Sequence, residues 1–372
     1  MNILLAGGGS AGHINPMLAV SEVAKKYGFS VIYLVGNSKL DNQLLEKQML
    51  AGEIVEHIKK VSFPRPAFHQ HIFYIIRLIT FPIRFVKQII KVLEIIKNDK
   101  IDICLGFGGY ISPPAYIAAK LKKVPIYIHE ANLKIGLANK LGSRFAKRFF
   151  TAFPDTQIAG KANEKIQFVG LPLRKSLFEK KVSNKDTTKK PLFSFATKQP
   201  VLLVLGGSLG AKSINKTVKK SLPSLLKKAN VIHITGAGKQ FSVSKKYHGK
   251  YKQFEYLEHI EQAYKVSDFA ISRAGAGSVL ELSAVGLPAC FVPLDVGNGE
   301  QSLNASYLVK AGAGIVCADK DFSPEFIENA ILPILLNKAQ TAAMREKSLK
   351  LSITDAAEKI IQTILTDIKN DD

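Results

Sequence analysis

The fold is decided by the stretch Leu4-Leu5-Ala6-Gly7-Gly8-Gly9-Ser10-Ala11-Gly12, in which a short apolar run leads into glycines and then into a segment of helix length. The second half of the chain repeats this order in Val204-Leu205-Gly206-Gly207-Ser208-Leu209-Gly210-Ala211. Glycines at such a turn allow close backbone approach, and the amides at the start of the next helix can bind an anion. The repetition predicts two nucleotide-binding folds that face each other across a cleft.

Short apolar runs alternate with amphipathic segments along most of the chain, which is typical of parallel strands covered by helices on both faces. The expected strands are 3–6, 30–35, 101–106, 126–129 and 149–152, then 201–206, 231–235, 254–256, 269–272 and 289–293. Residues 173–200 between the halves carry many lysines and no periodicity. We therefore predict an α/β protein with two Rossmann-like domains, residues 1–172 and 173–372, and a C-terminal helix that can pack back on the first domain.

Composition narrows the class of protein. The 372 residues are 47% hydrophobic and 22% charged, which suits globular domains, and the net charge of +22 attracts polyanions such as nucleic acid, anionic lipid or a phosphorylated substrate. Three well-separated cysteines in apolar runs favour reduced, buried thiols and a cytoplasmic setting. The N-terminus does not resemble an export signal, and no uncharged stretch is long and apolar enough to span a bilayer.

Both glycine turns are compatible with phosphate binding. Neither has the G-x-G-x-x-G spacing and downstream acidic residue of a dinucleotide site, and neither ends in the Lys-Ser/Thr of a P-loop. NAD binding is therefore disfavoured. Phosphate contact and a plain tight turn both remain open for each turn.

His13 is a candidate catalytic residue. It follows the first glycine turn, at the start of an expected helix over 13–24 and near the carboxyl end of the first strand, where open α/β sheets bind ligands. A histidine titrates near neutral pH and can act as a general base. The alternative is a structural or helix-capping histidine.

Another glycine cluster runs from Ser272 to Glu281 and passes from a strand through a turn into a helix. Ser278 and Glu281 have the spacing of a capping box, which is the structural interpretation. In the functional interpretation, the loop approaches a nucleotide and the Glu281 carboxylate accepts hydrogen bonds from both ribose hydroxyls. The spacing permits both interpretations.

The segment from Ile72 to Ile96 has dense apolar residues, with Arg77, Arg84, Lys87 and Lys91 near one side at helical spacing. This pattern is typical of a basic amphipathic helix that lies in a membrane interface, and we expect it to be broken or started at Pro82. A core helix with one solvent-exposed face is the alternative.

Five motifs stand in order along nearly the whole chain, and three of them include the glycine turns and cluster described above. They are Gly8-Gly9-Ser10-Ala11-Gly12-His13-Ile14-Asn15-Pro16, Gly106-Phe107-Gly108-Gly109-Tyr110-Ile111-Ser112, His129-Glu130-Ala131-Asn132, Gly206-Gly207-Ser208-Leu209-Gly210-Ala211 and residues 273–293. Together they resemble the MurG family of peptidoglycan N-acetylglucosaminyltransferases, in glycosyltransferase family 28. An ordered set is far more specific than any one motif.

The resemblance implies a GT-B fold and transfer of GlcNAc from UDP-GlcNAc to the C4 hydroxyl of MurNAc in lipid I, an undecaprenyl-diphosphate-linked acceptor. The product is lipid II, formed with inversion for cell-wall synthesis and division. No metal and no other cofactor is implied. The resemblance also implies a peripheral enzyme on the cytoplasmic face of the bacterial plasma membrane, where the amphipathic segment docks on anionic lipid.

The same resemblance implies roles for individual residues. Ser10, Ala11 and Gly12 would face the donor sugar and the acceptor diphosphate, and His13 would be the base. Asn132 would hold GlcNAc, while Arg174 and Ser208 would meet the donor diphosphate. The remaining expected contacts are Tyr110 with substrate, Leu257 with Ala276, Gly277, Ser278, Val279 and Leu280 around uracil, Glu281 on ribose and Gln301 on sugar hydroxyls.

Several positions depart from the family pattern. Amide side chains common in the family are replaced by Ala131, Leu171, Leu209 and Glu300. The main ligating residues are kept, so the departures concern sugar recognition and acceptor identity.

Two other functions remain open. A related glycolipid synthase would transfer glucose or galactose from a UDP-sugar to diacylglycerol. A non-catalytic binding module for nucleotide sugars or nucleic acid is the other alternative. Nucleic acid is disfavoured as a partner because the chain has no aromatic-basic RNA-binding motif.

Overall fold

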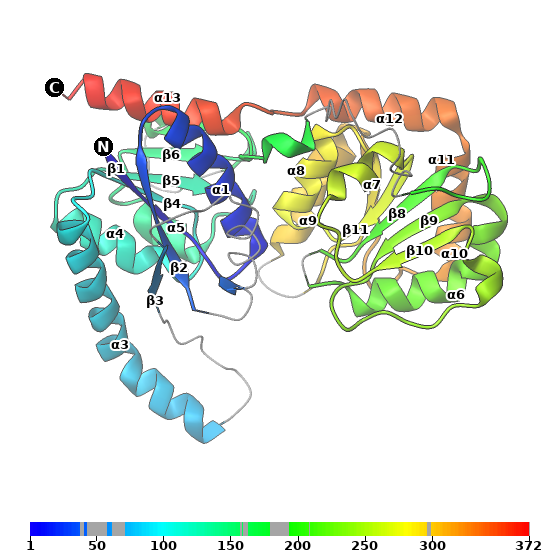
Figure 1. The fold of residues 1–372 in the computed structure, drawn as a ribbon, viewed down its shortest axis with the longest axis horizontal. Coiled ribbons are helices and arrows are strands. Elements are labelled where there is room, and N and C mark those ends of the chain that lie inside the picture. The colour runs from blue at the N-terminus through cyan, green and yellow to red at the C-terminus, as the bar shows by residue number, and fades with distance from the viewer. Residues whose placement is uncertain are drawn as a thin grey trace, which may run out of the picture. The chain divides into compact units, whose positions relative to one another are not determined.

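A computed structural model describes residues 1–37, 41–42, 58–61, 71–156, 158, 163–178, 193–207, 209–295 and 299–371, with the backbone alone at 61, 71–79 and 163. The chain divides into two compact units. Unit 1 holds Met1–Arg174 and Thr354–Asp372, and unit 2 holds Lys175–Ile353. Each unit has its own parallel sheet (Figure 1).

Unit 1 contains a seven-stranded sheet in the order β3-β2-β1-β4-β5-β6-β7, in which every pairing is parallel. The strands are β1 (Asn2–Ala6), β2 (Ser30–Gly36), β3 (Ile58–Val61), β4 (Ile103–Gly106), β5 (Ile126–Glu130), β6 (Arg148–Thr151) and β7 (Ile166–Phe168). The helices are α1 (Ala11–Lys26), α3 (His71–Asn98), α4 (Ser112–Leu121), α5 (Leu137–Gly142) and α13 (Ala356–Lys369), with the short η1 (Asn163–Lys165).

Alternation along the strands of unit 1 creates two hydrophobic cores, because successive side chains point to opposite faces of a sheet. Ile3 and Leu5 of β1 pack with α1 and α13. Leu4 and Ala6 of the same strand pack with α3 and α4 on the opposite face. Both faces are covered, which is why these strands are continuously apolar.

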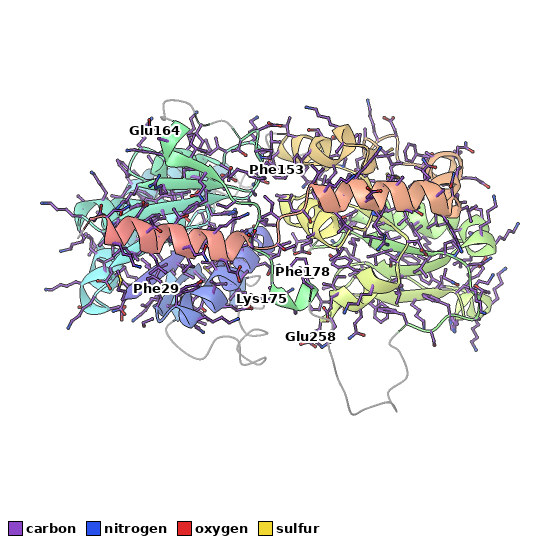
Figure 2. The ribbon with its side chains drawn as sticks, turned by 90° about the horizontal axis from the view of Figure 1, so that it is seen from above. Phe29, Phe153, Glu164, Lys175, Phe178 and Glu258 are labelled. Atoms are coloured by element: carbon purple, nitrogen blue, oxygen red, sulfur yellow. The ribbon has the colours of Figure 1, made fainter. Side chains whose placement is uncertain are left out.

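Helix α13 belongs to unit 1 although it ends the chain. The helix buries four residues in the core that α1 and β1 also form: Ala357, Ile360, Ile361 and Ile364. Figure 2 shows α13 in red, with the buried Phe29 of the same core labelled. The predicted boundary after residue 172 lies close to the observed division after Arg174. The predicted second domain ran to residue 372 with a C-terminal helix that can pack back on the first domain, and α13 packs on unit 1.

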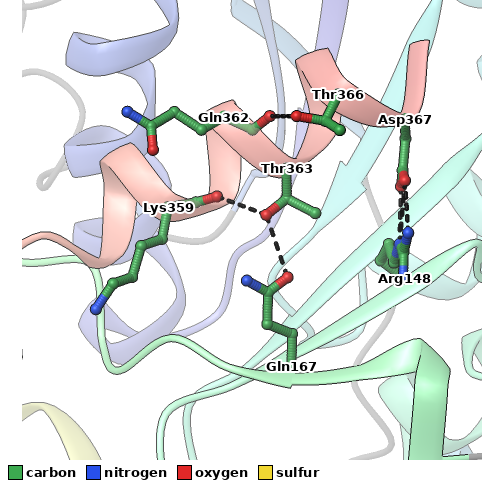
Figure 3. Close-up of a pocket in the computed structure, with 7 residues that line it drawn as sticks. All are labelled: Arg148, Gln167, Lys359, Gln362, Thr363, Thr366 and Asp367. Atoms are coloured by element: carbon green, nitrogen blue, oxygen red, sulfur yellow. Dashed lines mark hydrogen bonds and ion pairs between the residues drawn. The ribbon is translucent and has the colours of Figure 1, made fainter. Parts of the chain in front are cut away.

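The polar edge of α13 is held by a bidentate ion pair (Figure 3). Arg148 donates from Nε to Asp367 Oδ2 at 2.9 Å and from Nη2 to Oδ1 at 2.7 Å. Thr363 donates to Gln167 Oε1 at 3.1 Å. These residues line a pocket of about 230 Å³. Its polar groups largely bind one another, so we interpret the pocket as part of the contact between α13 and the sheet.

Unit 2 contains a six-stranded parallel sheet in the order β10-β9-β8-β11-β12-β13. Its strands are β8 (Val201–Leu205), β9 (Asn230–Ile234), β10 (Tyr251–Phe254), β11 (Phe269–Ser272), β12 (Ala289–Phe291) and β13 (Gly314–Val316). Its α-helices are α6 (Lys212–Lys228), α7 (Ile260–Val266), α8 (Ala276–Ala284), α9 (Glu300–Lys310), α10 (Pro324–Phe326), α11 (Leu332–Leu336) and α12 (Lys338–Lys350).

Short helical turns complete unit 2: η2 (Lys175–Leu177), η3 (Lys245–Tyr247) and the π-helical η4 (Ile327–Ile331). Helices α6 and α11 and the turn η4 bury their apolar residues in one core against β8, β9 and β11. The turn η2 contacts α7. Figure 2 labels Lys175 at the start of η2, Phe178 directly after it, and Glu258 in the segment that precedes α7.

Helix α3 is continuous through Pro82, so the prediction of a break or start there is wrong. Pro82 is exposed, and the carbonyl that it leaves without a helical donor can bind water. The last turns pack into the core through Val92, Ile95 and Ile96. The middle exposes Phe81, Ile83, Val86 and Ile90, which does not fit a core helix with one polar face. No helix in the described part of the chain is long and apolar enough to cross a bilayer.

The first prediction concerns the docking of α13. Ile364→Ala removes a fully buried side chain and should lower the opening free energy of β1 and α1 amides by about 2–5 kcal/mol. Hydrogen exchange measured peptide by peptide reads this out, and β8 and β9 should not change. Gln362→Ala, on the exposed face of α13, is the matched control and should stay within about 0.5 kcal/mol of wild type. Equal loss in both units would contradict the assignment of α13.

Candidate functional sites at the two sheet switch points

The strand orders place one candidate site in each unit. In unit 1 the connection direction reverses between β1 and β4, and in unit 2 between β8 and β11. Ligands of open parallel sheets bind beside the carboxyl ends of the strands at such switch points. The glycine turns identified in the sequence follow β1, β4, β8 and β11, so all four lie at these ends.

The turn after β1 is held by Asp41, a fully buried carboxylate. Asp41 Oδ1 accepts from the Gly9 amide at 2.6 Å, and Oδ2 accepts from the Tyr110 hydroxyl at 3.0 Å. The contact brings Tyr110, which follows β4, to the β1 turn. Asp41 was not anticipated from the sequence, because nothing near it in the chain marks it as functional.

Ser10 is the N-cap of α1, with an extended backbone and no side-chain cap bond. Ala11 and Gly12 form the first helical turn, whose amides have no intrahelical acceptors. The first turn of α1 contains no acidic residue. The Asp41 carboxylate bonds to the Gly9 amide ahead of the helix and leaves the amides of Ala11 and Gly12 without a carboxylate partner in that turn. The backbone amides of Ala11 and Gly12 and the hydroxyl of Ser10 are therefore groups that could bind an anion, and phosphate binding by this turn stays a prediction.

His13 lies next to this turn and its imidazole is oriented by two contacts. Nδ1 lies 2.9 Å from the Gly8 carbonyl oxygen and 3.0 Å from Ser10 Oγ. A carbonyl can only accept, so Nδ1 carries the proton and Nε2 keeps its lone pair. Burial lowers the pKa of His13 below its usual value, against smaller raising effects from the Gly8 bond, Glu130 and Asp41. The imidazole is thus neutral at pH 7 and has the form that a general base needs.

Gly109 allows the β4 turn to approach His13. Its φ is +76°, and an added Cβ would lie 2.3 Å from the Gly8 oxygen and 3.1 Å from His13 Nδ1. Any side chain at this position would displace the hydrogen bond that orients His13. The turns after β1 and β4 therefore form one structural unit around the imidazole.

Glu130, at the end of β5, holds the loop that carries Asn132. Its Oε1 accepts from the Asn132 amide at 3.0 Å, and its Oε2 accepts from Gly136 N at 2.9 Å and Asn139 Nδ2 at 3.0 Å. Glu130 and Asn139 are buried, whereas Asn132 is half-buried. The sequence motif 129–132 includes Glu130 but gave no role for it. The structure shows that Glu130 holds the backbone of Asn132 in position.

His129 is a structural histidine. It is buried, its Nε2 donates to the Gly170 oxygen at 2.9 Å, and burial lowers its pKa to about 4. The bond ties β5 to the segment Gly170–Arg174 at the end of the main stretch of unit 1. Arg174 is the last residue of that stretch and is half-buried.

In unit 2 the turn after β8 crosses a second glycine turn that follows β9. Gly210 has a φ of +69°, and an added Cβ would lie 2.0 Å from the Thr235 oxygen and 2.8 Å from Gly236 Cα. Lys239 reaches back to the same turn and donates to the Leu209 oxygen at 2.5 Å and the Gly210 oxygen at 3.1 Å. Ser208 lies outside the described residues. The turn leads into the uncapped N-terminus of α6.

Arg273 links the carboxyl ends of the neighbouring strands. Buried after β11, it donates from Nη1 to Asp319 Oδ1 at 2.6 Å and to the Val292 oxygen at 3.0 Å. Nη2 donates to Ser213 Oγ at 2.7 Å, in the first turn of α6. One guanidinium therefore fixes the ends of β11 and β12 and the start of α6.

The capping-box interpretation of Ser278 and Glu281 is wrong. Helix α8 starts at Ala276 with Gly275 as its N-cap, so Ser278 already has helical backbone and cannot be the cap. Gly277, Ser278, Val279 and Leu280 form the first turns of the helix behind this cap. Glu281 Oε2 instead accepts from the Tyr264 hydroxyl at 3.1 Å, which orients the carboxylate from α7.

Two further predicted residues lie at the same edge of unit 2. Leu257 follows β10 and is mostly buried. Gln301 lies in the first turn of α9, and its Oε1 accepts from the Leu294 amide at 3.0 Å. Unit 1 thus brings together Ser10, Ala11, Gly12, His13 and Tyr110. The predicted residues of unit 2 lie on the ends of strands and helices around β8 and β11.

Comparisons with known proteins agree with this architecture. Residues 3–151 match the glycosyltransferase family 28 N-terminal domain, and residues 201–360 match the glycosyltransferase family 28 C-terminal domain. A relative from Paenarthrobacter aurescens is 35% identical over 98% of this chain and 96% of its own length. The chain belongs to glycosyltransferase family 28.

That family 28 relative is named UDP-N-acetylglucosamine--N-acetylmuramyl-(pentapeptide) pyrophosphoryl-undecaprenol N-acetylglucosamine transferase, as is one from Bifidobacterium longum at 36% identity over 98% of this chain and 97% of its own. The crystal structure of Acinetobacter baumannii MurG matches with a TM-score of 0.75 and 26% identity, covering 98% of this chain and 99% of that one. The predicted GT-B fold is confirmed.

The fold alone is shared more widely. UDP-GlcNAc 2-epimerase from Neisseria meningitidis, solved with UDP-GlcNAc bound, matches with a TM-score of 0.68 at 15% identity, covering 98% of this chain and 100% of that one. At this identity the likeness extends to the architecture and not to the chemistry.

The second prediction tests the glycine crossing of this family 28 protein. Gly238→Ala adds a side chain at φ +66° into open space and should cost only the left-handed strain of about 1–2 kcal/mol. Gly210→Ala has the same strain and also meets the Thr235 backbone, so it should cost about 1–3 kcal/mol more. Hydrogen exchange of β8 and β9 amides measures both. Equal effects would contradict the crossing.

Proposed function

We propose that this chain transfers GlcNAc from UDP-GlcNAc to the C4 hydroxyl of MurNAc in lipid I and so forms lipid II for peptidoglycan synthesis. Full-length relatives at 35% and 36% identity carry the name of this transferase. The structural observation that carries the proposal is the orientation of His13 beside an uncapped helix N-terminus at the unit 1 switch point. A base and an anion site in one place suit an acceptor that has both a hydroxyl and a diphosphate.

Unit 1 is the acceptor side in this proposal. The acceptor diphosphate lies against the amides of Ala11 and Gly12, where the helix dipole favours negative charge. His13 Nε2 removes the proton from the C4 hydroxyl as its oxygen attacks the anomeric carbon of GlcNAc. The bond from that carbon to the UDP oxygen breaks, and attack from the opposite face inverts the configuration. Asn132, held by Glu130, contacts the GlcNAc group.

Unit 2 is the donor side. Leu257 and the start of α8 enclose uracil, and Glu281 accepts from the ribose hydroxyls while the Tyr264 hydroxyl orients it. Gln301 contacts the sugar hydroxyls. The turn before α6, which includes Ser208, takes the diphosphate, where amides stabilise the charge that develops on the leaving UDP. Arg174, the last residue of unit 1, is the proposed guanidinium contact of the same diphosphate.

The enzyme acts as a peripheral protein at the cytoplasmic face of the plasma membrane in this proposal. Helix α3 exposes Phe81, Ile83, Val86 and Ile90 together with Arg84 and Lys87. Apolar side chains flanked by basic ones suit the interface of an anionic leaflet, where the undecaprenyl chain of the acceptor resides. No nucleic acid partner is proposed.

The third prediction separates the proposed reaction from the glycolipid-synthase alternative. Radiolabelled GlcNAc from UDP-GlcNAc should be transferred to lipid I and appear in lipid II, and neither UDP-glucose nor UDP-galactose should label diacylglycerol. Glu281→Gln should raise the KM for UDP-GlcNAc more than it lowers kcat, because a carboxylate accepts from both ribose hydroxyls and an amide does so less well. Label found in diacylglycerol alone would overturn the proposed reaction.

The fourth prediction concerns pH. A base must be neutral, so activity rises with pH through the pKa of His13; because that pKa is lowered, the midpoint of the acid limb of kcat/KM should fall below 6.5. His13→Ala should lower kcat by about 10²–10⁴-fold and remove this limb. His248→Ala, at an exposed position, is the control and should leave the profile intact. A midpoint above 7 would contradict a neutral imidazole with a lowered pKa.

A further inference from the structure

The outer face of α6 in unit 2 is composed almost entirely of lysine. Its exposed residues are Lys212, Lys216, Lys219, Lys220, Pro223, Lys227 and Lys228. The opposite side is apolar and buried in the core through Ile214, Val218, Leu222, Leu225 and Leu226. Positions three, four and seven or eight apart fall on one side of a helix, so the six lysines form a continuous stripe, the lysine face.

The surrounding sequence reinforces the positive charge. Residues 187–254 contain fourteen lysines and no aspartate or glutamate. Lys250 lies at the C-terminal end of α6, where its Nζ donates to the Leu226 oxygen at 2.9 Å. Figure 1 shows α6 alongside β8, β9 and β10, the strands that this acid-free stretch also contributes.

The positive charge of the lysine face is only weakly compensated by acidic groups within the described part of the chain. None of its six lysines forms an ion pair there, whereas Lys350 and Lys359 on other helices pair with acids four residues away. Lys219 instead lies 5.1 Å over the Phe241 ring. Glu325 on α10 is an acidic neighbour of Lys220; the pKa of Glu325 is lowered first by the Ser323 hydroxyl and to a lesser extent by Lys220.

Such a stripe destabilises the helix that carries it. Lys212, Lys216 and Lys220 are spaced four apart, and like charges at this spacing repel. Lys212 also lies at the positive end of the helix dipole. An external anionic surface would remove this cost.

The chemistry of the face selects the partner. Specific protein interfaces are depleted in lysine and depend on aromatic residues and arginine, and single-stranded nucleic acid needs stacking platforms. In the described residues of 193–254, Leu209 is the one large apolar side chain that is exposed, and no arginine occurs. Lysines alone act as mobile point charges, which suits a diffuse layer of anionic lipid headgroups.

We propose that the lysine face of α6 is a purely electrostatic contact between unit 2 and an anionic membrane surface. The inference rests on the proposed function, in which the acceptor is carried by a membrane. It differs from the contact proposed for α3, because α3 exposes apolar side chains that can enter the interface and the lysine face exposes none. The unit that binds the donor thereby has its own, salt-sensitive membrane contact.

The fifth prediction uses vesicles of phosphatidylglycerol and phosphatidylcholine with the full-length protein. K216Q/K220Q/K227Q/K228Q should lower the partition coefficient at 0.15 M salt by at least tenfold, since each lysine near such a surface contributes about fivefold. The charge-matched control K310Q/K338Q/K347Q/K350Q, on α9 and α12, should change it by less than threefold. A variant with arginine in place of the same four α6 lysines keeps the positive charge and should bind vesicles as wild type does. Equal losses in the α6 and control variants would overturn the proposal.

Salt and α3 variants separate this proposal from the α3 contact. The α6 contribution should vanish at 1 M salt, where the Debye length is about 3 Å, while I83S/I90S should lower the salt-resistant part of binding. Transfer to a water-soluble acceptor analogue should be unchanged in the α6 variant, because it alters no proposed donor contact. If the α6 variant binds vesicles as tightly as wild type, the α6 contact is overturned and the proposed reaction still stands. This holds also if the variant has lost binding to RNA, which would make RNA the partner of the lysine face. If the wild-type protein transfers no GlcNAc to the acceptor analogue, the proposed reaction is overturned instead.

Discussion

The hydrogen bond from the His13 imidazole to the Gly8 carbonyl oxygen is the interaction on which the proposed acceptor side depends. It turns Nδ1 into a donor and leaves Nε2 as the basic atom. The bond exists because the turn after β1 is closed by Asp41 and because Gly109 lets the turn after β4 approach without a side chain. Burial, which lowers the pKa of His13, then keeps the imidazole neutral. Backbone geometry, orientation and protonation state therefore have a common origin.

The same principle organises unit 2 with different residues. There the turn after β8 is closed by the Gly210–Gly236 crossing and by Lys239, and Arg273 ties together the ends of β11, β12 and the start of α6. Both units present uncapped helix N-termini at a switch point, and the two differ in what lies beside them. Unit 1 has the oriented imidazole of His13, and unit 2 has the Glu281 carboxylate held by Tyr264; the proposed division into acceptor and donor sides rests on this difference.

Much of this was predictable from sequence, because buried parallel strands are continuous apolar runs and glycine turns mark their carboxyl ends. The missed strands β3, β7 and β13 are edge strands of three or four residues, such as Ile166–Phe168, and are too short for a periodic signal. Strand β10 was predicted at 254–256 but lies at Tyr251–Phe254. Tyr251 is buried in the core, whereas Tyr256, which suggested the later position, is exposed. Asp41 and the partners of Arg273 act through contacts distant in sequence, so no local pattern reveals them.

The most direct test of the central claim is the ¹⁵N NMR spectrum of the His13 imidazole in the full-length protein, assigned with a His13→Gln variant. We expect a neutral ring at pH 7 with the proton on Nδ1 and a pyridine-like shift for Nε2, and a ring that titrates only below pH 6.5. A proton on Nε2 in the neutral ring, or an imidazolium that persists at pH 7, would contradict it.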